Sequence, residues 1–270
     1  MALNEPVKAK PALLIDLDGV LYQGDSAIAG ASETMDWVKA ENIPYLYLTN
    51  TTSVSRKSLL EKFDQLGIEA EAEDIFTPII ATSQWLGARK MRRGVLFVTK
   101  NALPDFSGID IIGPDTESRV DAVVVGDLGE GWDFFTLNRA FRLLMREPKP
   151  VLIALGMTRY WAAADGLRLD VAPFVKALEF ASDTQAQVIG KPSPAFYESA
   201  LSLLECEPGN ALMIGDDIVG DIEGAQSAGL RSILVKTGKF REQDLQGSIK
   251  PDALLDTIAD LPAWWAEKLG

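Results

Sequence analysis

The chain has 270 residues, of which 47% are hydrophobic and 24% charged, and its formal net charge is −13 at pH 7. This length can bury the core of one large domain or of two smaller ones. The negative charge argues against nucleic acid as a partner, because a phosphate backbone requires a basic surface. It argues against an anionic membrane surface for the same reason.

The counts of cysteine and histidine further limit the chemistry that this chain can perform. The single cysteine, Cys206, excludes an internal disulfide, and residues 1–10 hold no apolar run long enough for a signal peptide. Both observations predict a cytoplasmic protein. The chain has no histidine, which excludes Ser-His-Asp and Cys-His catalysis and nearly all catalytic zinc sites. Acid–base chemistry would therefore come from carboxylates, lysine or tyrosine.

The first informative segment is an apolar run in residues 12–20 that ends at Asp16 and Asp18, followed by a glycine. Its apolar part is typical of a strand buried on both faces of a parallel sheet. Ligands of open α/β sheets bind just beyond the carboxyl ends of the strands. Two carboxylates there repel each other, and Mg²⁺, which prefers oxygen ligands, would relieve that repulsion. From this stretch alone, a solvated Asp-Gly turn is an equal alternative.

Strand and helix patterns alternate along the rest of the chain, which predicts parallel βαβ units. Strands are predicted at 44–48, 94–99, 120–125, 150–155, 211–214 and 231–235. Helices are predicted around Met35 and Val38, from an N-cap at Ser53 to Gly67, over 74–89, 134–145 and 171–180, from Ser193 onward, and over 219–228. The middle block has its own α/β rhythm and is long enough for a small domain.

Three predicted strands end in polar or acidic residues: Asp16 and Asp18, Thr49 and Asn50, and Asp216 and Asp217. If these strands are parallel neighbours, the side chains converge on one edge of the sheet. Lys191 precedes a predicted helix, and Asp221 lies near the start of another. Each residue alone is explained more readily as a loop, a turn or a solvated charge. Their joint occurrence in this order indicates a site.

The four motifs resemble those of the haloacid dehalogenase-like hydrolase superfamily. They are Asp16-Leu17-Asp18-Gly19-Val20, Leu48-Thr49-Asn50, Gly190-Lys191-Pro192 and Gly215-Asp216-Asp217-Ile218-Val219-Gly220-Asp221. The segment between the second and third motifs resembles the α/β cap of subfamily IIA. The resemblance implies a doubly wound, parallel-sheet (Rossmann-like) α/β core at residues 1–80 and 186–270, with an inserted α/β cap domain at 81–185.

The resemblance also implies catalytic roles. Asp16 would be the nucleophile and form an aspartyl-phosphate, and Asp18 would protonate the leaving group and then activate water. Lys191 would neutralise Asp16 and the phosphate. Thr49 and Asn50 would hydrogen-bond the phosphoryl oxygens.

A magnesium site is implied in the same way. Asp16, the main-chain carbonyl of Asp18, and Asp216 would hold Mg²⁺, and Asp217 or Asp221 would support them from a second position. Asp18 favours a phosphatase or phosphomutase, because the superfamily's dehalogenases lack an acid there and its transport ATPases carry threonine.

The expected activity is Mg²⁺-dependent hydrolysis of a small phosphorylated substrate. A closer likeness within subfamily IIA, carried by Gly131-Trp132, Leu152–Gly156 and Thr237–Arg241, suggests phospholysine, phosphohistidine or pyrophosphate as substrates. Sugar, glycolate or nucleotide phosphate esters are the alternative, as is a catalytically quiet regulatory member of the fold. Specificity would come from the cap, where Thr158, Arg159, Tyr160 and Asp170 are candidates. The resemblance also suggests a homodimer, and no nucleic acid or membrane partner is expected.

Overall fold

The computed structural model describes residues 10–163 and 166–269. Residues 1–9, 164–165 and 270 lie outside the described part, and with them nearly all of the N-terminal segment searched for a signal peptide. Contacts divide the chain into two compact units. Unit 1 comprises Met1–Leu48, Phe63–Asp74 and Ala200–Gly270, and unit 2 comprises Thr49–Lys62 and Ile75–Ser199. The functional division into a core of 1–80 and 186–270 and a cap of 81–185 remains a prediction.

Unit 1 is built on five parallel strands paired in the order β15-β14-β13-β1-β4. Their bounds are β1 Ala12–Asp16, β4 Tyr45–Leu48, β13 Ala211–Gly215, β14 Arg231–Val235 and β15 Ala253–Leu255. Every residue of β1 and β13 is buried, as expected for central strands covered on both faces. The register pairs Ile15 with Ile214, so the residues that follow these two strands leave the sheet at the same edge.

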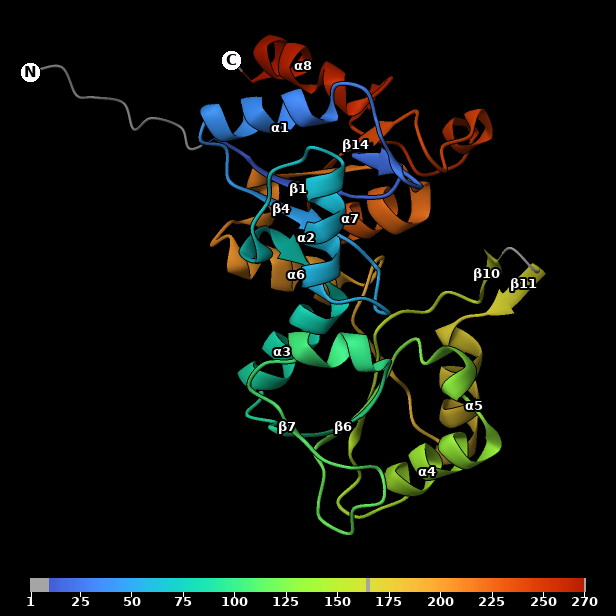
Figure 1. The fold of residues 1–270 in the computed structure, drawn as a ribbon. Coiled ribbons are helices and arrows are strands. Elements are labelled where there is room, and N and C mark those ends of the chain that lie inside the picture. Colours follow the sequence, from blue (N-terminus) through green and yellow to red (C-terminus); the bar gives the residue numbers. More distant parts are fainter. Residues whose placement is uncertain (1–9, 164–165, 270) are drawn as a thin grey trace, which may run out of the picture. The chain divides into compact units, whose positions relative to one another are not determined.

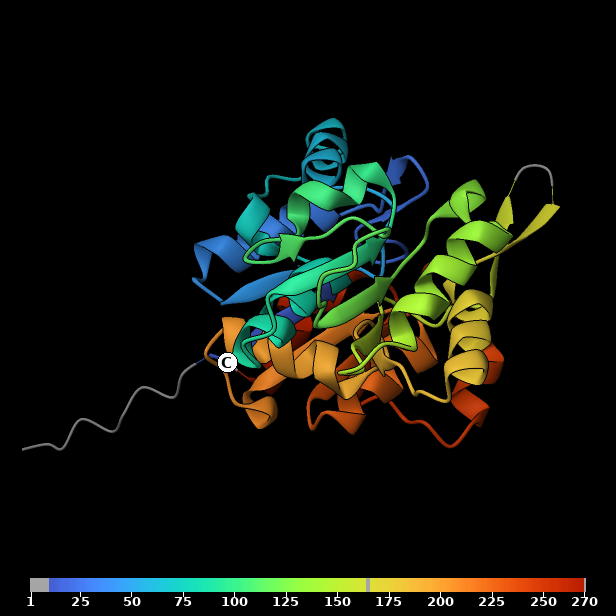
Figure 2. The ribbon, with the colours of Figure 1, turned by 90° about the horizontal axis from the view of Figure 1, so that it is seen from below.

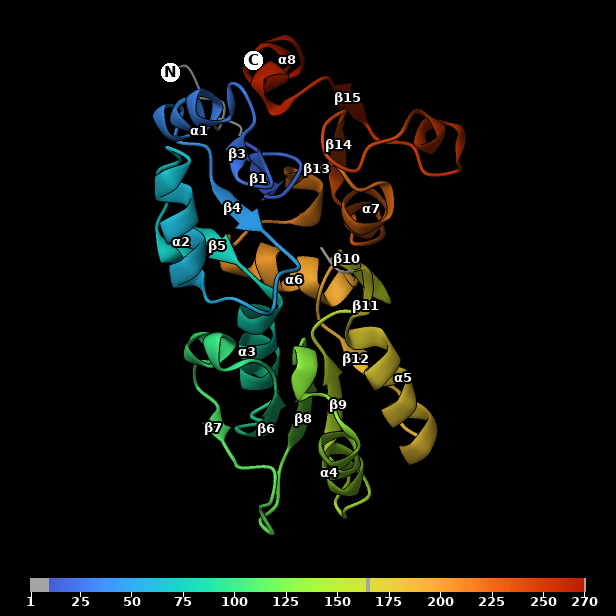
Figure 3. The ribbon, with the colours of Figure 1, turned by 45° about the vertical axis from the view of Figure 1, so that its right-hand side comes forward.

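The helices wholly within unit 1 are α1 (Ala31–Ala40), α7 (Gly224–Ser227) and α8 (Leu261–Lys268). The first and last of these, α1 and α8, lie side by side although they come from opposite ends of the chain (Figures 1 and 3). Trp37 of α1 packs edge-to-face on the buried Trp265 of α8, with ring centroids 5.9 Å apart. This aromatic contact fixes the C-terminal helix in unit 1.

Unit 2 contains a second parallel sheet, paired in the order β12-β9-β8-β6-β7. Its strands are β6 Arg93–Phe97, β7 Asp110–Ile111, β8 Ala122–Val125, β9 Val151–Ala154 and β12 Gln187–Val188. The helices α4 (Phe134–Leu144) and α5 (Val171–Ser182) lie next to each other beside this sheet (Figures 2 and 3). Trp132 stacks against both Phe97 and Phe174, with centroids 5.8 and 4.8 Å apart.

The predicted helix over 74–89 was wrong at its start. The structure has a short strand, β5 (Ile75–Phe76), followed by α3 (Pro78–Ala88). Thr77 is the N-cap of α3, because its hydroxyl accepts a hydrogen bond from the Ile80 N–H at 3.3 Å. Proline at the first helical position completes this start signal.

Two further helix boundaries also differ from prediction. Helix α2 (Arg56–Gln65) begins later than the expected cap at Ser53, and the Ser55 hydroxyl accepts from the Ser58 N–H at 3.3 Å instead. The predicted helix over 219–228 is a π-helical turn, Ile218–Glu223, that continues into α7. Wide turns of this type are frequent at functional sites, because they aim side chains that a regular helix would direct elsewhere.

The remaining elements are α6 (Pro194–Leu203) and two hairpins. The hairpins, which were not predicted, are β2 (Tyr22–Gln23) with β3 (Ser26–Ala27), and β10 (Tyr160–Ala163) with β11 (Gly166–Leu169). Two of the four boundaries between the units fall within α2 and α6. Among residues 10–163 and 166–269, none of the helices is long and apolar enough to cross a bilayer.

Candidate active site

Three buried carboxylates meet at the carboxyl edge of the unit 1 sheet. Asp16 ends β1, Asp216 follows β13, and Asp221 lies in the π-helical turn. One carboxylate oxygen from each lies within 4.8 Å of the other two, and the three residues are 6%, 1% and 1% exposed, respectively. We call Asp16, Asp216 and Asp221 the acidic centre. Such proximity is unfavourable for like charges in a buried site unless a cation offsets them.

Asp221 is held in the acidic centre by the main chain. Its Oδ2 accepts hydrogen bonds from the N–H groups of Asp216, at 3.2 Å, and Asp217, at 3.1 Å. Gly215 makes this return of the chain possible, because any Cβ at that position would overlap the Asp221 side chain. The glycine of this motif is therefore required by packing.

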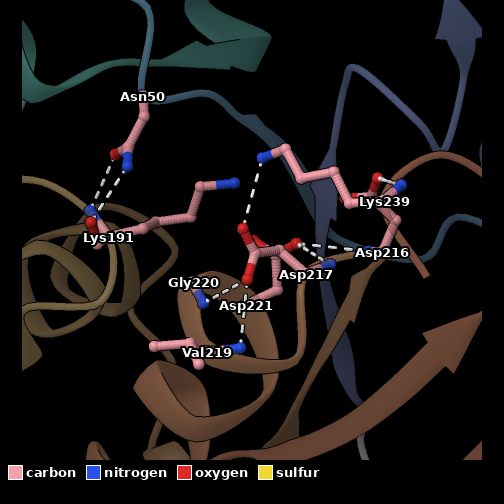
Figure 4. A network of polar contacts seen from close by, with 8 residues as sticks. All are labelled: Asn50, Lys191, Asp216, Asp217, Val219, Gly220, Asp221 and Lys239. Carbon is pink, nitrogen blue, oxygen red and sulfur yellow. Dashed lines mark hydrogen bonds and ion pairs between the residues drawn. The ribbon is translucent and has the colours of Figure 1, made fainter. Parts of the chain in front are cut away.

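Asp217 lies beside the acidic centre and is committed to other partners (Figure 4). Its Oδ1 accepts from the N–H groups of Val219, at 3.0 Å, and Gly220, at 2.9 Å, and its Oδ2 pairs with the Lys239 ammonium at 3.2 Å. Burial alone would raise the pKa of Asp217, but the Gly220 N–H, the Lys239 charge and the Val219 N–H lower it below its ordinary value. Asp217 therefore remains a carboxylate at neutral pH.

Asp18 lies outside this group of three. It is exposed, and it forms an isolated bridge with Tyr22 that closes the turn after β1. Within that turn the Gly19 N–H donates to the Tyr22 carbonyl at 2.6 Å, and Gly19 has a φ of +91°. A side chain at Gly19 would also overlap the Asp216 carboxylate. The turn thus requires glycine for both conformation and space.

In unit 2, Asn50 and Lys191 form a reciprocal pair. The Asn50 amide donates to the Lys191 carbonyl at 2.9 Å, and its oxygen accepts from the Lys191 N–H at 2.8 Å (Figure 4). Thr49 is buried, and its hydroxyl accepts from the Thr51 N–H at 3.1 Å. Both hydrogen bonds use main-chain atoms of Lys191 and fix its main chain against the segment that carries Asn50.

A cavity of about 270 Å³ lies within unit 2, and Asn50 is part of its wall. Its other lining residues are Thr51, Thr52, Ser53, Asp127, Leu155, Gly156, Thr158, Trp161, Asp170 and Val171. Two of the four candidate specificity residues, Thr158 and Asp170, therefore line this cavity. Burial and the nearby charge of Asp127 raise the pKa of Asp170, although the Val171 N–H opposes the shift.

The donor set of the acidic centre fits a hard divalent cation. It offers carboxylate oxygens from three buried side chains within 4.8 Å of one another, and Mg²⁺ prefers oxygen ligands and usually takes one or two carboxylates. A softer metal would favour nitrogen or sulfur donors. The chain has no histidine, so imidazole cannot contribute.

Sequence reasoning missed one charged residue of this region. Lys239 follows β14 in the segment Thr237-Gly238-Lys239, which carries part of the likeness within subfamily IIA but has no predicted role. A glycine after a buried strand, with a hydroxyl residue before it and a lysine after it, was the available signal. Its significance depends on contact with Asp216 and Asp217, which lie more than 20 residues away in the chain.

The structure is that of a two-unit α/β protein with parallel sheets and a buried acidic centre. A sequence model described as haloacid dehalogenase-like hydrolase matches residues 13–106, and another described as HAD-hydrolase-like matches residues 188–261. The chain belongs to the haloacid dehalogenase-like hydrolase family, as its four motifs predicted.

Named relatives cover nearly the whole chain. Phospholysine phosphohistidine inorganic pyrophosphate phosphatase from Rattus norvegicus is 39% identical over 264 residues, which cover 96% of this chain and 95% of the relative. Haloacid dehalogenase-like hydrolase domain-containing protein 2 from Bos taurus is 43% identical over 237 residues, or 88% of each chain. The closer likeness predicted within the family is thereby confirmed.

Solved structures show the same fold. The p-nitrophenyl phosphatase from Archaeoglobus fulgidus superposes with a TM-score of 0.85 at 23% identity, covering 94% of this chain and 99% of that one. NagD from E. coli superposes with a TM-score of 0.83 at 21% identity, covering 93% and 98%. The α/β architecture with parallel sheets and an inserted cap domain is confirmed by these likenesses.

Proposed function

We propose that this protein is a Mg²⁺-dependent phosphatase that hydrolyses a small phosphorylated substrate through an aspartyl-phosphate on Asp16. The observation that carries the proposal is the acidic centre, in which Asp16, Asp216 and Asp221 are buried with carboxylate oxygens within 4.8 Å of one another. Proteins seldom bury three like charges together without a cation or a chemical use for them.

The residues of this chain divide the reaction into two displacements. In the first, a carboxylate oxygen of Asp16 attacks phosphorus, the bond from phosphorus to the leaving oxygen breaks, and Asp18 gives that oxygen its proton. In the second, Asp18 takes a proton from water, and the resulting nucleophile attacks phosphorus. The bond between Asp16 and phosphorus breaks, which frees the carboxylate and inorganic phosphate. A carboxylate nucleophile is ionised at neutral pH and needs no histidine to activate it.

The other site residues would bind and orient. Asp16 and Asp216, with the Asp18 carbonyl, would hold Mg²⁺, and the buried Asp221 would support them. When bound, Mg²⁺ would neutralise charge on the transferred phosphoryl group. Asp18 is exposed at the sheet edge, which suits a group that must exchange protons with a leaving group and with water.

The phosphoryl group would be recognised by residues of unit 2. Thr49 offers a hydroxyl, Asn50 an amide and Lys191 an ammonium ion. The main chain of Lys191 is fixed by its two hydrogen bonds with the Asn50 side chain. Charge-assisted hydrogen bonds of this kind suit phosphoryl oxygens. The cavity that Asn50 lines, with its volume of about 270 Å³, supports a small substrate.

For the substrate we propose phospholysine, phosphohistidine or pyrophosphate, on the strength of the relatives that carry those names at 36–40% identity. Hydrolysis of sugar, glycolate or nucleotide phosphate esters is the second candidate. It is supported by the fold shared with p-nitrophenyl phosphatases and NagD. Rates on a panel of these compounds and on an aryl phosphate, with Mg²⁺ and with EDTA, separate the candidates.

The test has three informative outcomes. Mg²⁺-dependent release of phosphate from N–P compounds or pyrophosphate, at rates well above those for esters, supports the first candidate. Preference for an ester supports the second. A rate unaffected by EDTA contradicts the metal-dependent mechanism, and absence of turnover on every compound favours a catalytically quiet member of the family.

A further inference from the structure

Lys239 connects the segment after β14 to the acidic centre through two separate contacts. Its main-chain N–H donates to Oδ2 of Asp216 at 2.6 Å, and its ammonium pairs with Oδ2 of Asp217 at 3.2 Å (Figure 4). One residue therefore touches a proposed metal ligand with its backbone and the adjacent aspartate with its charge. The first contact is independent of the side chain, so the two can be separated by mutation.

The segment before Lys239 is packed against the same aspartate. Gly238 has a φ of +61°, and a Cβ on it would overlap the Asp216 carboxylate. The Thr237 hydroxyl donates to the Gly19 carbonyl, in the turn that carries Asp18. The Thr237-Gly238-Lys239 segment thus contacts both Asp216 and the turn after β1. These contacts fix the position of the Lys239 main chain.

The charge of Lys239 acts on more than its direct partner. Burial would lower the pKa of Lys239, but the charges of Asp217, Asp216 and Asp16 raise it. The ammonium ion is therefore within electrostatic range of two members of the acidic centre. Its side chain is 66% exposed and that of Asp217 is 34% exposed, so the ion pair itself contributes little to folding stability. The same charge also interacts with the buried carboxylates of Asp216 and Asp16.

We propose that Lys239 is a positioning residue that acts as a built-in counter-charge for the acidic centre. It holds Asp217 away from the metal ligands and offsets carboxylate repulsion in the metal-free protein. The inference rests on the proposed function only in taking the acidic centre as a Mg²⁺ site. In this arrangement a bound divalent cation and the ammonium ion repel each other, so Lys239 weakens Mg²⁺ binding and keeps the metal exchangeable.

The test is calorimetric titration of Mg²⁺ into metal-free protein, comparing wild type with three variants. Lys239→Met keeps the aliphatic stem and the main-chain bond to Asp216 but removes the charge. We expect its dissociation constant for Mg²⁺ to fall roughly three- to tenfold. Lys239→Arg keeps the charge and should stay within about twofold of wild type. The matched control is Lys236→Met, which removes a lysine from the same segment whose ammonium pairs with Asp256 at 2.7 Å; it should leave Mg²⁺ binding unchanged.

Two further measurements separate this role from a merely structural one. The tightening in Lys239→Met should shrink when the titration is repeated at about 0.5 M monovalent salt, because screening weakens partly exposed charge interactions. Thermal unfolding in EDTA should show Lys239→Met less stable than wild type, with a larger stabilisation on adding Mg²⁺. Lys239→Gln also removes the charge but keeps a polar group at the end of the side chain, and it should behave like the methionine variant.

The possible failures are distinguishable. If wild-type protein does not bind Mg²⁺, the metal-dependent function and this proposal both fall. If wild type binds Mg²⁺ and Lys239→Met binds it equally or more weakly, the counter-charge role is wrong and the proposed function is untouched. Calorimetry needs no turnover, so neither result depends on having found the substrate.

Discussion

The two parallel sheets of this molecule are built alike and end differently. In unit 1, Asp16 ends β1 and Asp216 follows β13, and both are buried in the acidic centre. In unit 2, Gly126-Asp127 follows β8, and the half-buried Asp127 accepts a hydrogen bond from the Gly129 N–H at 2.8 Å in a simple turn. Both sheets bury apolar strands in the same way, so the strands alone would not tell them apart.

The difference lies in what surrounds the carboxylates. Around the acidic centre, Gly19, Gly215 and Gly238 each leave space that a Cβ would fill with overlap. The Asp127 carboxylate, by contrast, accepts its hydrogen bond from Gly129, only two residues further along the chain. Strand ends in α/β proteins are general positions for function, and in this molecule the end of the unit 1 sheet is the one that carries the cluster of buried acids.

The largest expected contrast is between Asp16→Asn and Asp127→Asn. The first removes the anionic oxygen of the proposed nucleophile at one strand end and should lower turnover at least about 1,000-fold. The second makes the same change at the other sheet, in a residue that lines the unit 2 cavity, and should lower turnover by at most about tenfold. Steady-state rates and circular dichroism on both variants check this. Equal effects would mean that the two strand ends do not differ in function.

Asp18→Asn should have a smaller effect that depends on the leaving group. An alkyl oxygen must be protonated as it departs, whereas an activated aryl oxygen need not be. We expect a loss of about 100-fold or more on an alkyl phosphate and a much smaller loss on an aryl phosphate, with a burst of aryl alcohol. The measurement is the ratio of mutant to wild-type rates on each ester. An equal loss on both without a burst would remove the acid–base role and leave Asp16 as nucleophile.

The variants Gly19→Ala and Gly24→Ala test whether close packing around the acidic centre requires glycine. Both glycines have positive φ, +91° and +57°, but a Cβ at Gly19 overlaps the Asp216 carboxylate, whereas one at Gly24 meets nothing within 4 Å. Gly24→Ala should cost about 1 kcal/mol of unfolding free energy from its backbone conformation alone. Gly19→Ala should cost about 3 kcal/mol or more and weaken Mg²⁺ binding. Urea unfolding and calorimetry measure both, and similar values for the two variants would contradict the packing argument.

The smallest expected effect is a pH-dependent one in unit 2. Burial would raise the pKa of Glu179, but the Ala186 N–H and Lys176 lower it overall; these donors lie 2.9 and 2.7 Å from its oxygens. Because the folded pKa lies below the unfolded one, this stabilisation is present above pH about 4.3 and is lost as pH falls through the folded pKa. Glu179→Gln should cost about 0.5–1 kcal/mol at neutral pH.

The check is urea unfolding of Glu179→Gln and wild type across a pH series. The difference between them should narrow as the pH falls below about 4. Glu130→Gln is the control, because that side chain is 94% exposed, and it should match wild type throughout. A difference that stays constant with pH would show that the ionised carboxylate is not what stabilises this part of unit 2.

The sequence predicted the parallel strands and the residues at their ends because both depend on local pattern. The run that forms β1 is apolar up to Asp16. Parallel pairing places Ile15 beside Ile214, so the acidic residues after these two positions lie at the same edge of the sheet. The contacts of Lys239 were not predicted, because they depend on how the loop after β14 places its main chain and side chain against Asp216 and Asp217, which local pattern does not specify. The π-helical turn was also not predicted. The spacing of apolar residues over so short a segment does not distinguish a π-helical turn from an α-helical one.

The central claim is that Asp16 carries the phosphoryl group during turnover. The most direct measurement is acid quenching of the enzyme within its first turnover on a labelled aryl phosphate with Mg²⁺, followed by peptide mass spectrometry. The account predicts a hydroxylamine-sensitive phosphoryl adduct on the peptide that contains Asp16, absent in Asp16→Asn and accumulating in Asp18→Asn. Turnover with no adduct on that peptide, or with the adduct on another residue, would contradict it.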